Sequence, residues 1–130
     1  MLATGATGGI GLHIARQFAD RGWTIHVGAR DSARGEEAAA QVSGRVVALD
    51  VTDVDTIAAA AKPVPSSTSW STTPASRSIP DPVTETDVEV FRRTYGTNVF
   101  GVVAMTNAFL PALRRSAHRR IVNLSSAPDR

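Results

Sequence analysis

The sequence contains no cysteine, and it has only one lysine and one tyrosine among its 130 residues. The absence of cysteine excludes a disulfide framework, a thiolate metal site and a cysteine nucleophile, and we predict no metal site. The sequence also has no charged-then-apolar leader and no apolar run of about 18 residues, so neither a signal peptide nor a membrane span is indicated. We therefore expect a cytoplasmic protein with no membrane partner.

A strong excess of one charge is also missing, because 14 basic residues oppose 12 acidic ones and leave a formal charge of +2. All basic residues except Lys62 are arginines, and the arginine pairs are scattered among apolar and acidic neighbours. This pattern is typical of a solvated surface, and we expect no nucleic-acid partner. The hydrophobic content of 42% is that of one globular domain, which we predict to span residues 1–130.

What the sequence does contain is an alternation of strand and helix patterns. The expected strands are the apolar start at residues 1–4 and the segments 23–29, 45–50 and 119–126. The expected helices follow the first glycines and continue at residues 30–44, 51–62 and 81–116. This order predicts an α/β fold, a Rossmann-type doubly wound parallel sheet with helices on both faces.

The turn after the first strand, "TGATGGIG", is rich in glycine. Gly5, Gly9 and Gly11 lie where a dinucleotide would place its pyrophosphate, because glycine allows a sharp turn and close approach of backbone N–H groups. The alternative is a plain glycine-rich turn. Arg30 ends the second strand, where it could pair with the 2′-phosphate of NADP or simply lie at the surface beside Asp31.

Five motifs together carry a family resemblance: "TGATGGIG", "GARD", "LDVTD", "TNVFG" and "IVNLSS", in this order. The chain resembles the first half of the short-chain dehydrogenase/reductase family, and its carbonyl-reductase-like members most. The resemblance implies NAD(P)(H)-dependent oxidation of an alcohol or reduction of a carbonyl on a small-molecule substrate, by a homo-oligomer. With Arg30 in place, NADP is expected ahead of NAD.

The resemblance and the glycine turn together give a set of expected site residues. The cofactor-binding residues are Thr4, Gly5, Thr7, Gly9, Ile10, Gly11, Arg30, Asp50 and Val51. Asp50 would accept a hydrogen bond from the adenine amino group, although it could equally cap the next helix. Asn98 would hold a water in a proton relay, and Ser126 would orient the substrate oxygen. The alternatives are a local helix hydrogen bond for Asn98 and a strand-end hydroxyl for Ser126.

The family's Tyr-x-x-x-Lys pair, expected about a dozen residues after Ser126, does not occur in these 130 residues. Tyr95 precedes Asn98, and no lysine stands four residues beyond it. The tyrosine needs the lysine to lower its pKa for proton transfer. We therefore expect the C-terminal part to be missing and the chain to be inactive alone. The alternatives are a nucleotide-binding or regulatory fragment without activity, and the product of a damaged gene without function.

The stretch "VPSSTSWSTTPASRSIP" stands where the resemblance requires an apolar fourth strand and the turn "NNAG". Codons for Ser67–Ser76 can be chosen that, read one base earlier, spell Val-Asp-Val-Leu-Val-Asn-Asn-Ala-Gly-Ile. We hypothesise that about Pro65–Arg77, within an irregular segment at residues 63–79, is translated out of frame. The fourth strand is then expected to be missing, which would separate the last strand from the rest of the sheet and leave a poorly stable product.

Overall fold

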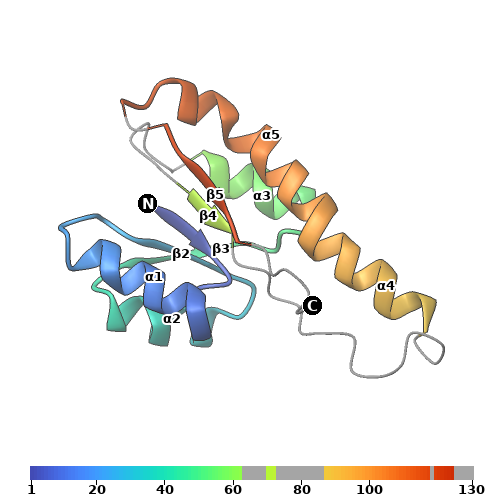
Figure 1. Ribbon diagram of the computed structural model, residues 1–130, viewed down its shortest axis with the longest axis horizontal. Coiled ribbons are helices and arrows are strands. Elements are labelled where there is room, and N and C mark those ends of the chain that lie inside the picture. Colours follow the sequence, from blue (N-terminus) through green and yellow to red (C-terminus); the bar gives the residue numbers. More distant parts are fainter. Residues whose placement is uncertain (63–69, 73–86, 118, 125–130) are drawn as a thin grey trace, which may run out of the picture.

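The computed structural model describes residues 1–62, 70–72, 87–117 and 119–124. In chain order its elements are β1 (Leu2–Thr4), α1 (Gly9–Ala19), β2 (His26–Ala29), α2 (Ser32–Gln41), β3 (Arg45–Ala48), α3 (Val54–Ala61), β4 (Trp70–Thr72), α4 (Val88–Tyr95), η2 (Gly96–Phe100), α5 (Gly101–Arg114) and β5 (Ile121–Asn123). Within the described residues the strands form one parallel sheet in the order β3-β2-β1-β4-β5 (Figure 1). The predicted doubly wound α/β fold is confirmed.

Aspartate side chains cap the N-termini of α2 and α3, the helices that follow β2 and β3. The Asp31 carboxylate accepts a hydrogen bond from the backbone N–H of Arg34 at 3.1 Å at the start of α2. Asp53 accepts from the backbone N–H of Asp55 at 2.9 Å at the start of α3. Such caps satisfy N–H groups that have no partner within the helix. The alternative that Asp50 caps the helix after β3 is therefore wrong.

The two faces of the sheet carry separate hydrophobic clusters, because successive side chains of a strand point to opposite sides. Ala3 of β1 packs with residues of α1 and α2, among them Ala15 and Ala38. Leu2 packs instead with residues of α3 and α5, including Phe109. Figure 1 shows α1 and α2 grouped apart from α3 and α5, so helices cover both faces as predicted.

The fourth strand is present, and the prediction that it is missing is wrong. Its residues Trp70–Thr72 pair with β1 on one side and with β5 on the other, in register Leu2↔Trp70 and Trp70↔Ile121. The physical reason is that parallel pairing uses backbone N–H and C=O groups, which these residues carry as Val or Leu would, and Trp and Thr favour strands. The last strand therefore stays in the sheet. The rest of the 63–79 segment lies outside the described residues.

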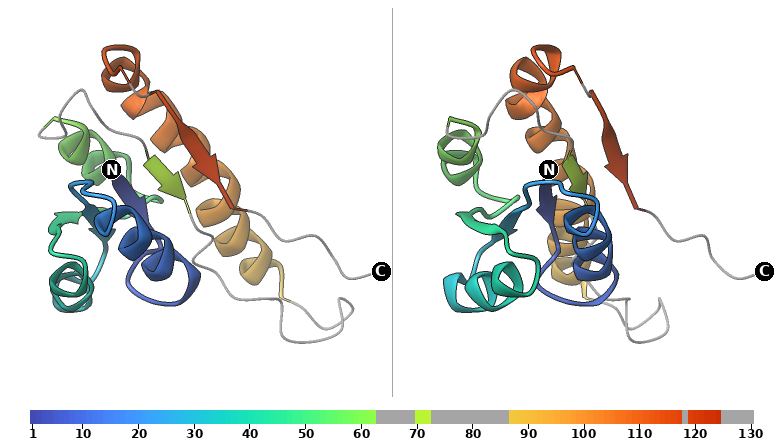
Figure 2. Two further views of the ribbon diagram at one scale, coloured as in Figure 1. Left: turned by 60° about the vertical axis from the view of Figure 1, so that its left-hand side comes forward. Right: turned by 90° about the vertical axis from the view of Figure 1, so that its left-hand side faces the viewer.

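Helices α4, η2 and α5 run together as one long helix, Val88–Arg114 (Figure 2). By length and composition alone this helix could cross a membrane, because the mean hydropathy of its most apolar part is 1.2. The sequence had indicated no membrane span. Core helices of α/β proteins pass the same test. The inner face packs on the sheet through Met105, Phe109 and Leu113.

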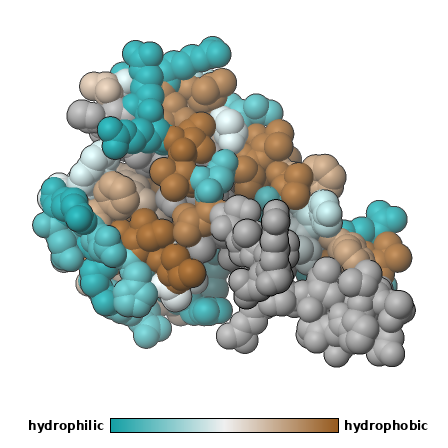
Figure 3. Space-filling view, viewed as in Figure 1, coloured by the Kyte–Doolittle hydropathy of each residue, from teal (hydrophilic) through white to brown (hydrophobic). Residues whose placement is uncertain are grey.

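The outer face of the same helix is apolar as well. Val99, Phe100 and Val103 are exposed, although Phe109 of the same helix is buried. In Figure 3 apolar residues, in brown, follow the α5 part of this helix. The apolar surface of this helix is therefore wider than the face that packs on the sheet.

Candidate functional site

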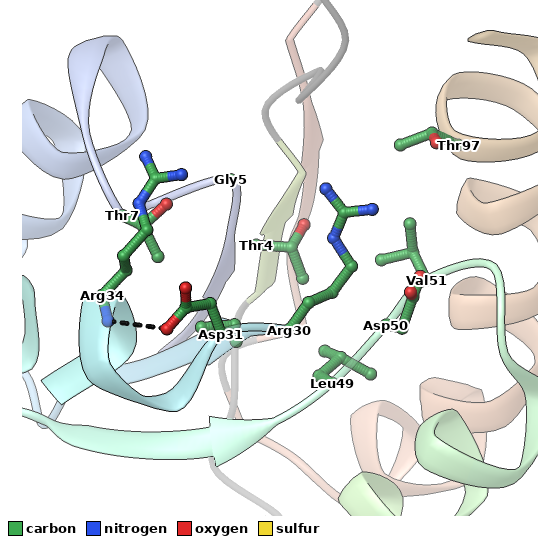
Figure 4. Close-up of a pocket in the computed structure, with 12 residues that line it drawn as sticks. Thr4, Gly5, Thr7, Arg30, Asp31, Arg34, Leu49, Asp50, Val51 and Thr97 are labelled. Atoms are coloured by element: carbon green, nitrogen blue, oxygen red, sulfur yellow. Dashed lines mark hydrogen bonds between the residues drawn. The ribbon is translucent and has the colours of Figure 1, made fainter. Parts of the chain in front are cut away.

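A pocket opens where β1, β2 and β3 end, at the carboxyl edge of the sheet (Figure 4). Ligands of open α/β sheets bind at this edge, outside the ends of the strands. The residues that line the pocket are Thr4, Gly5, Thr7, Gly28, Ala29, Arg30, Asp31, Arg34, Leu49, Asp50, Val51 and Thr97. They come from three strand ends, from α2 and from the long helix, so residues far apart in the sequence meet here.

The glycine turn shapes one wall of this pocket. Gly5 and Gly9 have φ angles of 66° and 55°, a left-handed conformation that glycine adopts most readily. A Cβ on Gly11 would overlap the carbonyl oxygen of Gly5, so only glycine lets α1 begin this close to the end of β1. The turn therefore brings the start of α1 close to the end of β1, where the pocket opens.

Six of the nine residues predicted to bind the cofactor line the pocket, namely Thr4, Gly5, Thr7, Arg30, Asp50 and Val51. The other three, Gly9, Ile10 and Gly11, form the first turn of α1 and do not line it. Ile10 is 65% exposed. The structure thus brings the predicted residues that follow β1 together with those that follow β2 and β3, and the first turn of α1 continues from the first group.

The second strand end carries two cations that face this pocket. In Figure 4 the Arg34 guanidinium points toward Thr7, and the Arg30 guanidinium projects between Thr4 and Val51. Among the residues that the structure describes, neither guanidinium is paired with a carboxylate. Asp31 lies between them but is engaged with the backbone N–H of Arg34. The two side chains are therefore available to an anion, which arginine recognises through paired N–H groups.

Asp50 and Val51 form the wall that follows β3. One Asp50 carboxylate oxygen accepts from the backbone N–H of Thr52 at 2.9 Å and from its hydroxyl at 2.7 Å. The backbone N–H of Asp50 donates to the Thr56 hydroxyl at 3.0 Å. These bonds hold the loop in one shape, and among the described residues no hydrogen bond engages the other carboxylate oxygen of Asp50. An acceptor for a base amino group is therefore present at the pocket.

Thr4 ends β1 beneath the pocket and is 5% exposed. Its hydroxyl oxygen is buried and has no hydrogen-bond partner within the described part of the chain. A buried hydroxyl without a partner costs about 1–3 kcal/mol, and such groups are few in native structures. The orphaned hydroxyl, the glycine wall and the two free guanidiniums together fit a phosphorylated nucleotide.

Asn98 lies in the π-helical turn η2, one residue beyond Thr97, which lines the pocket. Its side-chain oxygen Oδ1 is buried and has no partner among the residues described. The side-chain oxygen thus does not make the local helix hydrogen bond that was the alternative to a catalytic role. Single π-helical turns inside an α-helix, such as η2, occur frequently at functional sites. The other predicted catalytic residue, Ser126, lies outside the described residues.

The sequence reasoning missed six of the residues that line the pocket: Gly28, Ala29, Asp31, Arg34, Leu49 and Thr97. Arg34 had a readable signal, because it stands one helical turn after Arg30 in a helix that begins at the same strand end. Gly28 had none, since its role is steric: a Cβ there would lie 2.8 Å from the Cδ2 of Leu49. Thr97 depends on packing between distant segments, which spacing along the sequence does not report.

A model of the short chain dehydrogenase family matches residues 1–128. The chain belongs to this family. It is 33% identical to sulfoacetaldehyde reductase 2 of Chromohalobacter salexigens over 97% of its own length and 54% of that protein. This short-chain dehydrogenase chain therefore spans about half the length of such a relative.

Solved structures that are similar to this chain agree with the fold. A 3-ketoacyl-(acyl-carrier-protein) reductase from Brucella melitensis, complexed with NADH, superposes with a TM-score of 0.83 at 26% identity, covering 96% of this chain and 55% of that one. L-Sorbose reductase from Gluconobacter frateurii, complexed with NADPH and L-sorbose, gives 0.80 at 28%, covering 94% and 51%. Both nicotinamide dinucleotides thus occur among solved structures similar to this chain.

Proposed function

We propose that the protein is an oxidoreductase of the short-chain dehydrogenase type that prefers NADP(H) to NAD(H). The nicotinamide, when bound, supplies or takes up the hydride exchanged with a carbonyl or alcohol substrate. The observation that carries this proposal is the pocket at the ends of β1, β2 and β3, with two arginines free of carboxylate partners in the described chain. An arginine at the end of the second strand suits a 2′-phosphate, whereas a carboxylate there suits the free ribose hydroxyl.

Each pocket wall has a role in this proposal. Thr4, Gly5 and Thr7, with Gly9, Ile10 and Gly11 at the start of α1, would hold the pyrophosphate, since the helix N-terminus offers free backbone N–H groups. Arg30 would bind the 2′-phosphate, and Asp50 and Val51 would flank the adenine. Asn98 would hold a water of the proton relay, and Ser126 would orient the substrate oxygen.

The test is a fluorescence titration of the purified chain with NADPH and with NADH. We expect NADPH to bind at least tenfold more tightly, and Arg30→Ala to remove most of that difference while it changes NADH binding little. Arg21→Ala is the matched control, because that exposed arginine follows α1, does not line the pocket, and donates through its side chain to the backbone carbonyl oxygen of Gln17. Equal affinity of the native chain for the two dinucleotides would overturn the NADP preference.

We further propose that residues 1–130 alone bind the nucleotide without turnover, and that about Pro65–Arg77 is translated out of frame. The position of β4 supports the second point, because Trp70–Thr72 is the triplet that the shifted reading gives as Leu-Val-Asn. Sequencing the DNA over these codons tests the out-of-frame translation. Codons that cannot spell the shifted peptide would contradict it. A chain in which Ser67–Ser76 carries the shifted reading is expected to melt at a higher temperature.

Association of two copies is the remaining part of the proposal. The exposed residues Val99, Phe100 and Val103 on the long helix support it, because apolar patches of this kind mark protein interfaces. Sedimentation of the native chain and of Phe100→Asp is the test. We expect the substitution to shift the protein to monomer, and a native chain that stays monomeric at high concentration contradicts this part alone.

A further inference from the structure

Gly101 closes the π-helical turn that carries Thr97 and Asn98. Its backbone N–H donates to the carbonyl oxygen of Gly96, which spans the five residues of η2. Its backbone angles, φ −60° and ψ −39°, are those of an ordinary right-handed helix, which every L-residue adopts. Alanine would favour the helix more than glycine does. The conformation therefore gives no reason for glycine at this position, and the reason must lie in the space around it.

That space is filled by the loop at the nucleotide pocket. A Cβ on Gly101 would lie 2.7 Å from the carbonyl oxygen of Val51 and 3.0 Å from its Cγ2. The oxygen belongs to the backbone, and the hydrogen bonds between Asp50 and Thr56 fix the start of this loop. The loop cannot yield as the end of a flexible side chain would. The long helix thus approaches the pocket loop as closely as it does because position 101 has no side chain.

The contact between Gly101 and Val51 lies next to the pocket wall. Val51 lines the pocket and also packs against the cluster of Leu49, Phe109 and their neighbours. Thr97, from the turn that Gly101 closes, lines the same pocket. The separation between Val51 and η2 therefore sets the width of this end of the pocket and its distance from Asn98.

We propose that Gly101 is a positioning residue, which couples the adenosine end of the pocket to the turn that holds Asn98. This inference rests on the proposed nucleotide function. It predicts that a methyl group at position 101 pushes the helix and the Val51 loop apart. Adenosine binding then weakens, whereas phosphate binding at the glycine turn, on the other wall, does not.

The test compares Gly101→Ala with Gly96→Ala. Gly96 lies in the same helix with φ −52° and ψ −48°, and a Cβ there meets nothing within 4 Å. Each variant and the native chain are titrated with 2′,5′-ADP, which contains the adenosine, and with inorganic pyrophosphate, which does not. We expect Gly101→Ala to raise the Kd for 2′,5′-ADP at least tenfold and to leave that for pyrophosphate within twofold, and Gly96→Ala to change neither by more than twofold.

Three other outcomes have definite meanings. If Gly101→Ala binds 2′,5′-ADP as the native chain does, the positioning role is overturned while the proposed function stands. If it loses both ligands together, with or without loss of the helical circular dichroism signal, position 101 serves packing alone and the proposal is again overturned. If the native chain binds neither ligand, the nucleotide function fails and this inference falls with it.

Discussion

The hydroxyl of Thr56 bonds both backbone polar groups of Asp50: it accepts from the Asp50 N–H at 3.0 Å and lies 2.9 Å from the Asp50 carbonyl oxygen. Thr56 belongs to the first turn of α3, whereas Asp50 begins the pocket loop after β3. The first turn of this helix therefore holds the wall against which a base would lie.

Thr56→Val tests this link, because it keeps the shape of the side chain and removes the hydroxyl. The partly buried N–H of Asp50 then loses its acceptor, so we expect a loss of about 1–2 kcal/mol in the free energy of unfolding. Weaker binding of 2′,5′-ADP should accompany it. Urea unfolding and titration measure the two effects. Thr56→Ser, which restores the hydroxyl, is expected to recover most of both, and a Thr56→Val chain with unchanged binding would show that the loop holds itself.

Gly11→Ala tests the close approach of α1 to the glycine turn. The added Cβ would overlap the Gly5 carbonyl oxygen, so helix and turn must separate, at a cost of about 1–3 kcal/mol. We expect NADPH binding to fall at least tenfold. Gly8→Ala is the control, because Gly8 has extended backbone angles and a Cβ there meets nothing within 4 Å. Equal effects of the two changes would contradict the steric argument.

Arg34→Gln tests whether the second arginine, which the sequence reasoning missed, contributes to NADP preference. The cap of α2 survives this change, because Asp31 accepts from the backbone N–H of residue 34 and not from its side chain. We expect the NADPH affinity to fall about tenfold, equivalent to about 1.4 kcal/mol, with little change for NADH. Titrations at low and high salt decide it: the native preference should shrink with salt, and that of the variant much less.

Phe109→Ala tests the cluster shared by α3, α5 and the sheet. Phe109 is 2% exposed, and removal of a buried phenylalanine ring costs about 3–5 kcal/mol. Val103→Ala, on the exposed side of the same helix, should cost about 0.5 kcal/mol or less. Thermal melts of both variants measure the difference. A Phe109→Ala chain as stable as the native one would mean that α5 does not pack on the sheet in solution.

His26 gives the fold a dependence on pH. Burial lowers its pKa below the ordinary 6.5, and the positive charges of the Met1 amine and Arg45 lower it further. The unfolded chain therefore takes up a proton near pH 6.5 that the folded chain resists, so stability is full above that pH and falls on acidification towards the lowered pKa. Urea midpoints at about pH 7.5 and about pH 5.5 should differ less in His26→Gln than in the native chain. An identical pH response would exclude His26 as the cause.

The sequence allowed the order of elements and the pocket edge to be predicted, because local signals specify them. The glycine turn and the strand ends at Arg30 and Asp50 are readable over a few residues. The strand at Trp70–Thr72 was not, because its pairing depends on backbone groups that any sequence supplies. The exposure of Val103 could not be predicted, since helical spacing does not say which of two apolar sides meets the sheet. The contact between Gly101 and Val51 could not be predicted either, because it joins segments that are far apart in the sequence.

The two hydrophobic clusters have different consequences for the order of folding. The cluster of α1 and α2 is built entirely from residues between Met1 and Val46, so its contacts are local in the chain. The cluster of α3 and α5 joins Leu2 and Leu49 to Leu113, so its formation requires the closure of a long loop. Short closures form faster than long ones. We expect the first face to form early and act as a template, and the pocket wall made by the long helix to be completed last.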